Sequence, residues 1–260
     1  MAVSPARFEL EMKPGTETTV VVNLDYRALA TQAGPARIVA SLNDWTITPD
    51  GRIEYYRPNS MPNSASSWVV YSPGEATVTP GVIHPIRVTV SVPPDAAPGD
   101  HLTALIVEQR ADTIKYNKAE REMIVRYRLA SVFYIKVSQL TKKGSFEHLY
   151  AEQTSDGVVV TPTFKNSGNS LIRPTASLKI VDADGTIVTD LPDVARLPIL
   201  AGAELKAPTI VESQLKPGKY TVKYRVDFQD GSIATEGVTD LVVKPAAPQI
   251  ATSGTPPKKP

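Results

Sequence analysis

Runs of alternating apolar and polar residues recur along most of the chain. They include Thr18 to Leu24, Ile86 to Val92, His101 to Glu108 and Lys219 to Phe228. A period of two places every second side chain on the same face of a β-strand. Each run therefore predicts a strand with one buried face and one face in water, and together the runs predict an all-β protein.

Turn signals separate these runs. Asp-Gly pairs stand at residues 50–51, 156–157, 184–185 and 230–231, and Asp-Gly favours the positive φ angles that tight hairpins need. Short strands divided by turns about every 8 to 12 residues are typical of β-sandwiches. We therefore predict two immunoglobulin-like β-sandwich domains in tandem, over residues 3–140 and 145–244. Residues 245–260, rich in proline and small residues, are predicted to form a disordered tail.

One predicted strand, from Ile124 to Val137, is unusually long and is apolar on both faces over much of its length. Its alternation places Arg126, Arg128, Ala130, Val132 and Tyr134 on one face. If the opposite face is core, the first face offers two cations beside an apolar strip. Such a surface suits an added β-strand that ends in a carboxylate. The alternative is that these arginines pair with carboxylates at the rim of the domain.

Aromatic residues gather in the first half of the chain. We predict that Trp45 and Trp68 fill the sandwich core, because buried tryptophan is usual in immunoglobulin-like folds. Tyr55 and Tyr56 are consecutive, so one of them should point outward. The segment from Tyr56 to Trp68 is poor in apolar residues and rich in Asn, Ser and Pro, which indicates a loop that is mobile or ordered by a partner.

Charge and composition exclude several classes of function. The formal net charge is +1, from 28 Lys and Arg against 27 Asp and Glu, so no field of one sign favours nucleic acid or an anionic membrane as a partner. The absence of cysteine rules out disulfides and thiolate chemistry and gives weak support for export. No apolar run approaches the roughly 20 residues of a transmembrane helix.

The sequence offers no candidate catalytic or metal site. His84, His101 and His148 are scattered, and none lies in a metal-ligand spacing. The stretch from Asp182 to Gly185 lacks the rest of a calcium loop and predicts a hairpin instead. Nucleotide-binding and nucleophile-elbow motifs are missing. We therefore predict a protein that is not an enzyme and that uses no cofactor or metal.

The first 140 or so residues resemble the N-terminal domain of the periplasmic pilus-assembly chaperones, the PapD-like family. The resemblance rests on the order of an opening strand with an arginine (PARFEL), a strand with an asparagine (VVVNL), a tryptophan strand (LNDWTI) and two long strands that start near His101 and Ile124. It implies two immunoglobulin-like domains set at an angle, with the last long strand of the first domain donated to a pilus subunit. By position, it makes Arg7 the opening-strand cation and lets Arg126 or Arg128 stand for the family's lysine, which is absent here.

A second resemblance covers both halves of the chain. The stretches FELEMKPG, DGRIEYY, TFKNSG, VDADG and LKPGKY are similar to two-domain surface proteins of Gram-positive bacteria that bind peptidoglycan and WxL-type partners. This resemblance rests on turn residues that many bacterial immunoglobulin-like modules share. It implies a scaffold or adhesion role for Tyr55, Tyr56 and the segment from Asn59 to Ser67.

The leading hypothesis is a periplasmic chaperone-like protein of pilus or fimbrium biogenesis. It would bind extended polypeptides, such as pilus or surface subunits, by strand addition along Ile124 to Val137, with Arg7, Arg126 and Arg128 as anchoring cations. The alternative is a non-catalytic cell-envelope scaffold that binds peptidoglycan or a surface protein. Either way we expect an exported protein of the periplasm or cell surface, seen in its mature form with Ala2 or Val3 near its start.

Overall fold

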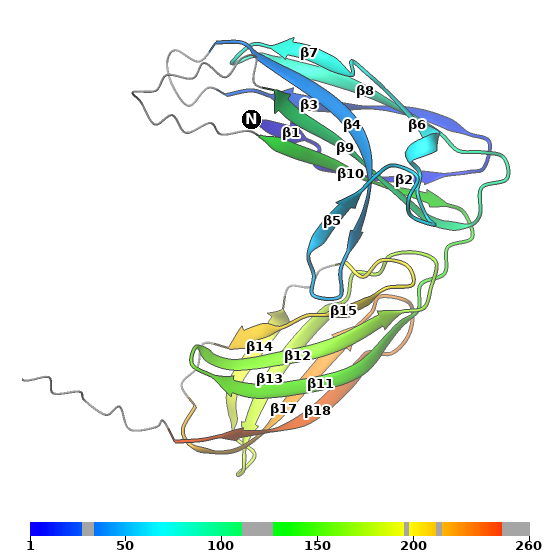
Figure 1. Cartoon of the computed structure of the whole chain (residues 1–260). Helices are drawn as coiled ribbons and strands as arrows, with labels where there is room; N and C mark the ends of the chain where they lie inside the picture. Colours follow the sequence, from blue (N-terminus) through cyan, green and yellow to red (C-terminus); the bar gives the residue numbers. More distant parts are fainter. Residues whose placement is uncertain (28–33, 111–126, 195–197, 212–214, 246–260) are drawn as a thin grey trace, which may run out of the picture.

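The computed structural model describes the chain except residues 28–33, 111–126, 195–197, 212–214 and 246–260. The described part is built from β-strands, with one short 3₁₀ helix, η1 (Ser66–Trp68). The strands form two β-sandwiches, one above the other in Figure 1. The prediction of an all-β chain with two immunoglobulin-like sandwiches in tandem is thus confirmed.

The first sandwich packs two sheets face to face. One has the strand order β1-β3-β8-β6 and the other β2-β10-β9-β4-β5, with β7 also paired to β4. The strands are β1 (Ala2–Ser4), β2 (Arg7–Met12), β3 (Glu17–Asp25), β4 (Ala36–Ile47), β5 (Ile53–Tyr56), β6 (Val69–Ser72), β7 (Glu75–Val78), β8 (Ile83–Ser91), β9 (Gly99–Arg110) and β10 (Arg128–Val137). We call the sheet that contains β10 the β10 sheet.

Between these two sheets lies the core of the first sandwich. Alternate residues of β3 and β8, among them Val22, Leu24 and Val88, are fully buried there. They meet Phe133 and Ile135 of β10. Burying one such side chain contributes about 1.5 to 3 kcal/mol to the stability of the fold. The apolar residues of the alternating pattern therefore stabilise the packing of the two sheets.

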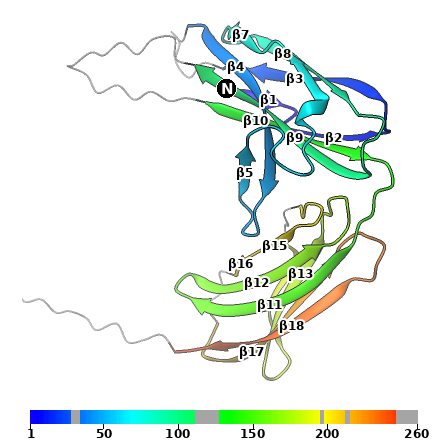
Figure 2. The same cartoon turned by 45° about the vertical axis from the view of Figure 1, so that its right-hand side comes forward.

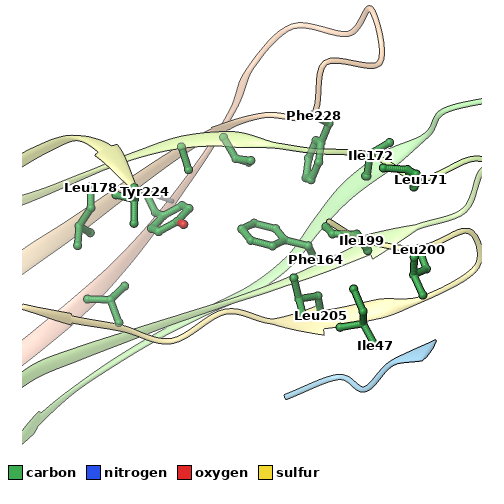
Figure 3. Packing of buried hydrophobic residues seen from close by; sticks show 14 of the residues in the cluster. Ile47, Phe164, Leu171, Ile172, Leu178, Ile199, Leu200, Leu205, Tyr224 and Phe228 are labelled. Carbon is green, nitrogen blue, oxygen red and sulfur yellow. The ribbon is translucent and has the colours of Figure 1, made fainter. Parts of the chain in front are cut away.

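The second sandwich also has two sheets. Their orders are β11-β12-β15, with β16 also paired to β12, and β14-β13-β17-β18. The strands are β11 (Gly144–Thr154), β12 (Gly157–Asn166), β13 (Thr175–Asp182), β14 (Ile187–Val194), β15 (Glu204–Lys206), β16 (Thr209–Val211), β17 (Gly218–Asp227) and β18 (Thr235–Val243). Phe164, Tyr224 and Phe228 lie at the centre of its core (Figure 3).

The four Asp-Gly pairs make the turns that the sequence predicts. The glycines have positive φ angles of 83° at Gly51, 130° at Gly157, 85° at Gly185 and 88° at Gly231. Three of them lie at the connections β4–β5, β11–β12 and β13–β14, and the fourth lies between β17 and β18. A side chain with a Cβ rarely adopts these angles, so each turn depends on its glycine.

The two sandwiches touch through the β4–β5 hairpin as well as through the chain that links β10 to β11. The hairpin reaches down from the β10 sheet toward β15 (Figures 1 and 2). At its tip the backbone N–H of Lys206 donates to the carbonyl of Pro49 at 2.6 Å. Ile47 lies beside Leu200 and Leu205 of the second sandwich (Figure 3). The joint is therefore formed by packed side chains of the hairpin as well as by the linking chain.

Candidate functional site

Strand β10 is paired on one side along its whole length and on the other side along only part of it. Antiparallel to β9, it pairs from Arg128 with Glu108 to Val137 with Gly99. Parallel to β2, it pairs from Val132 with Arg7 to Val137 with Met12. No described strand pairs with Arg128–Ser131 on the β2 side. We call these four residues the open edge.

Backbone groups of the open edge point in a direction that the neighbouring hydrogen bonds define. The N–H of Gln109 in β9 donates to the carbonyl of Tyr127 at 2.9 Å, whereas the N–H of Val132 donates to the carbonyl of Ala6 at 2.9 Å. The backbone N–H and C=O groups of odd-numbered residues in β10 therefore point toward β9, and those of even-numbered residues point toward the β2 side. It follows that the N–H and C=O groups of Arg128 and Ala130 point away from β9, where no described residue pairs with them.

The expectation that the whole run from Ile124 to Val137 offers a free edge is wrong. From Val132 onward the edge is occupied by β2 of the same chain. Ile124 to Arg126 lie outside the described residues. The rest of the edge is open because the chain joins the β10 sheet only at β2. The preceding strand, β1, pairs with β3 in the facing sheet. At this crossing the Ser131 hydroxyl donates to the carbonyl of Pro5 at 2.8 Å.

The two faces of β10 divide as the sequence predicts. Leu129, Phe133 and Ile135 pack into the core of the first sandwich. Arg128, Ala130, Val132 and Tyr134 lie on the opposite, outer face, which looks toward the second sandwich (Figure 1). Arg128 is exposed, and Ala130 and Val132 are half-buried. The predicted site residues of β10 that the structure describes therefore share one face.

Tyr134 differs from its neighbours on this face, because it belongs to the joint between the sandwiches. Its side chain is 3% exposed. Its ring meets the edge of Trp45 at 5.1 Å between centroids, and the Arg173 guanidinium of the second sandwich lies 5.8 Å from its centre. Burial raises the pKa of its phenol, although the charge of Arg173 lowers it in part. Tyr134 is thus packed inside the chain and is not available as a contact surface.

The predicted anchoring cations have different surroundings. Arg7 lies on the outer face of β2 beside Val132; its Nε is 3.3 Å from Oε1 of Glu9, and its side chain is 56% exposed. Arg128 is exposed and forms no ion pair with a carboxylate of the described residues. Arg126 lies outside the described residues. Arg7 and Arg128 therefore lie at opposite ends of the open edge.

Glu9 ties the two sandwiches together and could not be picked from the sequence. Its carboxylate accepts hydrogen bonds from Lys136 at 2.7 Å and from Arg173 at 2.6 Å. Burial acts to raise the pKa of Glu9, but these hydrogen bonds and the two positive charges outweigh it, so the pKa lies below its ordinary value. Glu9 is therefore held as an anion by one cation from each sandwich.

Asp100 forms a second buried link across the joint. Its carboxylate accepts the hydroxyl of Ser170 at 2.9 Å and the backbone N–H of Leu171 at 2.6 Å. Burial raises the pKa of Asp100, and the two hydrogen bonds compensate only in part. Next to it, the carbonyl of Asn169 would lie 2.8 Å from a Cβ placed on Gly99. Only glycine allows this close approach of the two sandwiches.

Tyr55 and Tyr56 lie on β5 opposite Trp45 and Asp44. Both are partly exposed, at 37% and 38%, so the expectation that one of them is exposed is confirmed for both. Tyr56 donates to the Glu54 carboxylate at 2.6 Å. Burial raises the pKa of the Tyr55 phenol, and the positive charge of Arg128 lowers it in part.

Trp45 is buried, as predicted, although not between the two sheets of the first sandwich, and Trp68 is only half-buried. Trp45 is 1% exposed, but it lies on the outer face of the β10 sheet, and its indole N–H donates to the carbonyl of Thr103 at 3.0 Å. It is outside the core of the first sandwich because odd positions of β4 face outward while Ile38 and Ala40 face inward. Trp68 is half-buried against that core and packs on the His101 ring at 4.3 Å.

The segment from Asn59 to Ser67 is held by its own domain, so the expectation of a mobile or partner-ordered loop is wrong. Asp44, 1% exposed, accepts the backbone N–H groups of Ser60 and Met61 and the hydroxyls of Ser64 and Ser66, at 2.6 to 2.9 Å. Burial acts to raise the pKa of Asp44, but the four hydrogen bonds lower it below its ordinary value. The signal in the sequence was a charge at an inward position of β4.

The histidines have ordinary structural surroundings. The Nε2 atom of His84 accepts the backbone N–H of Thr79 at 2.9 Å, and the Nε2 atom of His101 lies 2.9 Å from the carbonyl of Ala97. Among the described residues, no group of three or more His, Asp or Glu side chains is placed to hold a metal ion. No helix in the described part is long and apolar enough to span a membrane.

Comparison with known proteins gave structural matches only. No protein-family model matches the sequence, and no curated protein matches it. Among solved structures, a chain of a chaperone–tip adhesin complex of CFA/I fimbriae is similar, with 11% identity, a TM-score of 0.47 and coverage of 92% of this chain and 97% of that chain. The YadV chaperone is similar with 10% identity, a TM-score of 0.47 and coverage of 92% and 98%. The E. coli chaperone DraB is similar with 10% identity, a TM-score of 0.44 and coverage of 90% and 96%.

Proposed function

We propose that this protein is a chaperone-like holder of extended polypeptides in the bacterial periplasm, which it binds by adding their strand to the open edge of β10. The observation that carries the proposal is the unpaired edge itself: on the side away from β9, the N–H and C=O groups of Arg128 and Ala130 pair with no described strand, although β1 lies close to β10. A length of strand with unpaired backbone groups at the edge of a sheet is a template for another chain.

The alternative function is binding of peptidoglycan or a surface protein by Tyr55, Tyr56 and the segment from Asn59 to Ser67, and it stays a prediction.

Charge favours one direction for the added strand. The visiting strand would lie in line with β2, which runs parallel to β10. A visitor in the same direction ends beside Ala6, so its terminal carboxylate meets the guanidinium of Arg7. A visiting strand in the opposite direction would place its positively charged N-terminus beside Arg7. Arg7 keeps donors for this contact, because Glu9 is closer to Lys136 and Arg173 than to Arg7. We therefore propose a parallel strand with its C-terminus at Arg7.

Because the open edge has only four residues, we expect it to bind an added strand with modest affinity. Each main-chain hydrogen bond contributes about 1 kcal/mol net, and a few such bonds correspond to dissociation constants of roughly millimolar. Added affinity requires apolar side chains that bury area against Leu129, which is half-buried at this edge. A holder of this kind releases its client readily, as a chaperone must.

Replacing Ala130 with proline tests strand addition. Proline removes the N–H that faces the open edge, which no described residue uses, and proline is tolerated on such an edge. We expect Ala130→Pro to keep the thermal midpoint within a few degrees and to abolish the chemical-shift changes that a millimolar peptide, N-acetyl-Thr-Val-Thr-Val-Glu-Val-Thr with a free carboxylate, produces in the native protein. The readout is a two-dimensional NMR titration.

Ala130→Val is the matched control, because it changes the side chain at the same position and keeps the N–H. It should bind the peptide. Equal binding by the proline and valine variants would show that the backbone of the open edge is not the binding element.

A further inference from the structure

The open edge has a fixed end, which determines which residue of a visitor meets which residue of β10. Val132 pairs with Arg7, and the N–H of Val132 is already bonded to the carbonyl of Ala6. A visitor in line with β2 therefore ends no later than the place opposite Ala130. Counting back by the same one-to-one register, its third residue from the C-terminus lies opposite Arg128.

Residues that are opposite each other in a sheet point to the same face. The C-terminal residue and the third-last residue of the visitor therefore lie on the outer face, with Ala130 and Arg128. The penultimate residue points toward the core side, beside Leu129. The visitor thus places one particular side chain next to the exposed guanidinium of Arg128.

The positive charge of Arg128 has no carboxylate partner among the described residues. Glu108 is opposite Arg128 on β9, but it forms no ion pair with it. Arg110 and Arg37 face each other two residues further along the same outer face, where the Arg37 guanidinium pairs with Glu75. Glu9, the carboxylate nearest the other end, is bonded to Lys136 and Arg173. Among the described residues at the Arg128 end, the guanidinium groups of Arg128 and Arg110 form no ion pair, against one unpaired carboxylate, that of Glu108.

Resting on the proposed strand addition, we infer that Arg128 selects clients that carry Asp or Glu at the third residue from the C-terminus. An opposite charge directly across a strand pair stabilises and a like charge destabilises. Arg128 is exposed, so water screens the interaction and the preference is moderate. We expect a peptide with Glu at this position to bind about 3 to 10 times more tightly than the same peptide with Lys.

A charge exchange tests this inference. The probes are N-acetyl-Thr-Val-Thr-Val-Glu-Val-Thr and its counterpart with Lys in place of Glu, both with free carboxylates, titrated into the full chain and followed by NMR. The native protein should prefer the Glu peptide, and Arg128→Glu should prefer the Lys peptide. Arg128→Gln, the neutral control, should show little preference for either.

The two ways of failing are distinguishable. If both peptides bind the native protein equally, or if the preference is the same in Arg128→Glu, selection by Arg128 is wrong while strand addition stands. If neither peptide binds any variant at millimolar concentration, strand addition itself fails and the inference fails with it.

Discussion

Replacing Asp44 with alanine should lower the free energy of unfolding by about 3 to 5 kcal/mol, among the largest effects of any single change in this chain. The Asp44 carboxylate satisfies two backbone N–H groups and two hydroxyls in a place that is 1% exposed. Without it, these donors lose their acceptor, and a buried unsatisfied group costs about 1 to 3 kcal/mol. Urea denaturation followed by circular dichroism measures the loss.

Asp50→Ala is the control for this prediction. Asp50 is a carboxylate of the same β4–β5 region, but it is exposed and bonds only to the nearby Thr48 and Arg52. Its removal should leave the denaturation midpoint nearly unchanged. If Asp44→Ala were as mild as Asp50→Ala, the segment from Ser60 to Ser66 would have to be held by contacts other than the carboxylate.

Replacing Trp45 with alanine should cost about 3 to 5 kcal/mol, the range for truncating a buried tryptophan. The indole is 1% exposed, packs edge-on against Tyr134 and donates to the carbonyl of Thr103. Trp45→Phe retains one ring but loses the hydrogen bond and part of the buried area, so it should cost less, about 1 to 3 kcal/mol. Chemical denaturation of both variants gives the comparison.

Trp68→Ala is the matched control, because Trp68 is only half-buried and its ring rests on His101 at the edge of the core. Its loss should be clearly smaller than that of Trp45→Ala. The reverse order would mean that the outer face of the β10 sheet contributes little to stability and that the joint between the sandwiches is looser than its contacts indicate.

Local pattern explains how much of this fold the sequence reveals. The two-residue alternation identified the strands, and the Asp-Gly pairs identified four turns, because both signals act within a few residues. The same alternation placed Arg128, Ala130 and Val132 on one face of β10 correctly. These features need no knowledge of which strand is a neighbour in space.

Pairing between distant segments is what the sequence could not reveal. Arg7 and Val132 are neighbours although more than a hundred residues separate them, and nothing local in PARFEL indicates that it seals half of β10. Glu9, Lys136 and Arg173 likewise come from three separate segments. Asp44 was detectable, since a charge at an inward position of a strand must have buried partners.

Hydrogen exchange of the β10 amides tests the central claim most directly. In the free protein the amides of Arg128 and Ala130 should exchange quickly, while those of Leu129 and Ser131, which face β9, should be protected. Saturation with the Glu-containing peptide should slow the exchange of Ala130 and leave Leu129 unchanged. An Ala130 amide that is already protected in the free protein, or one that stays unprotected with peptide bound, would contradict strand addition at this edge.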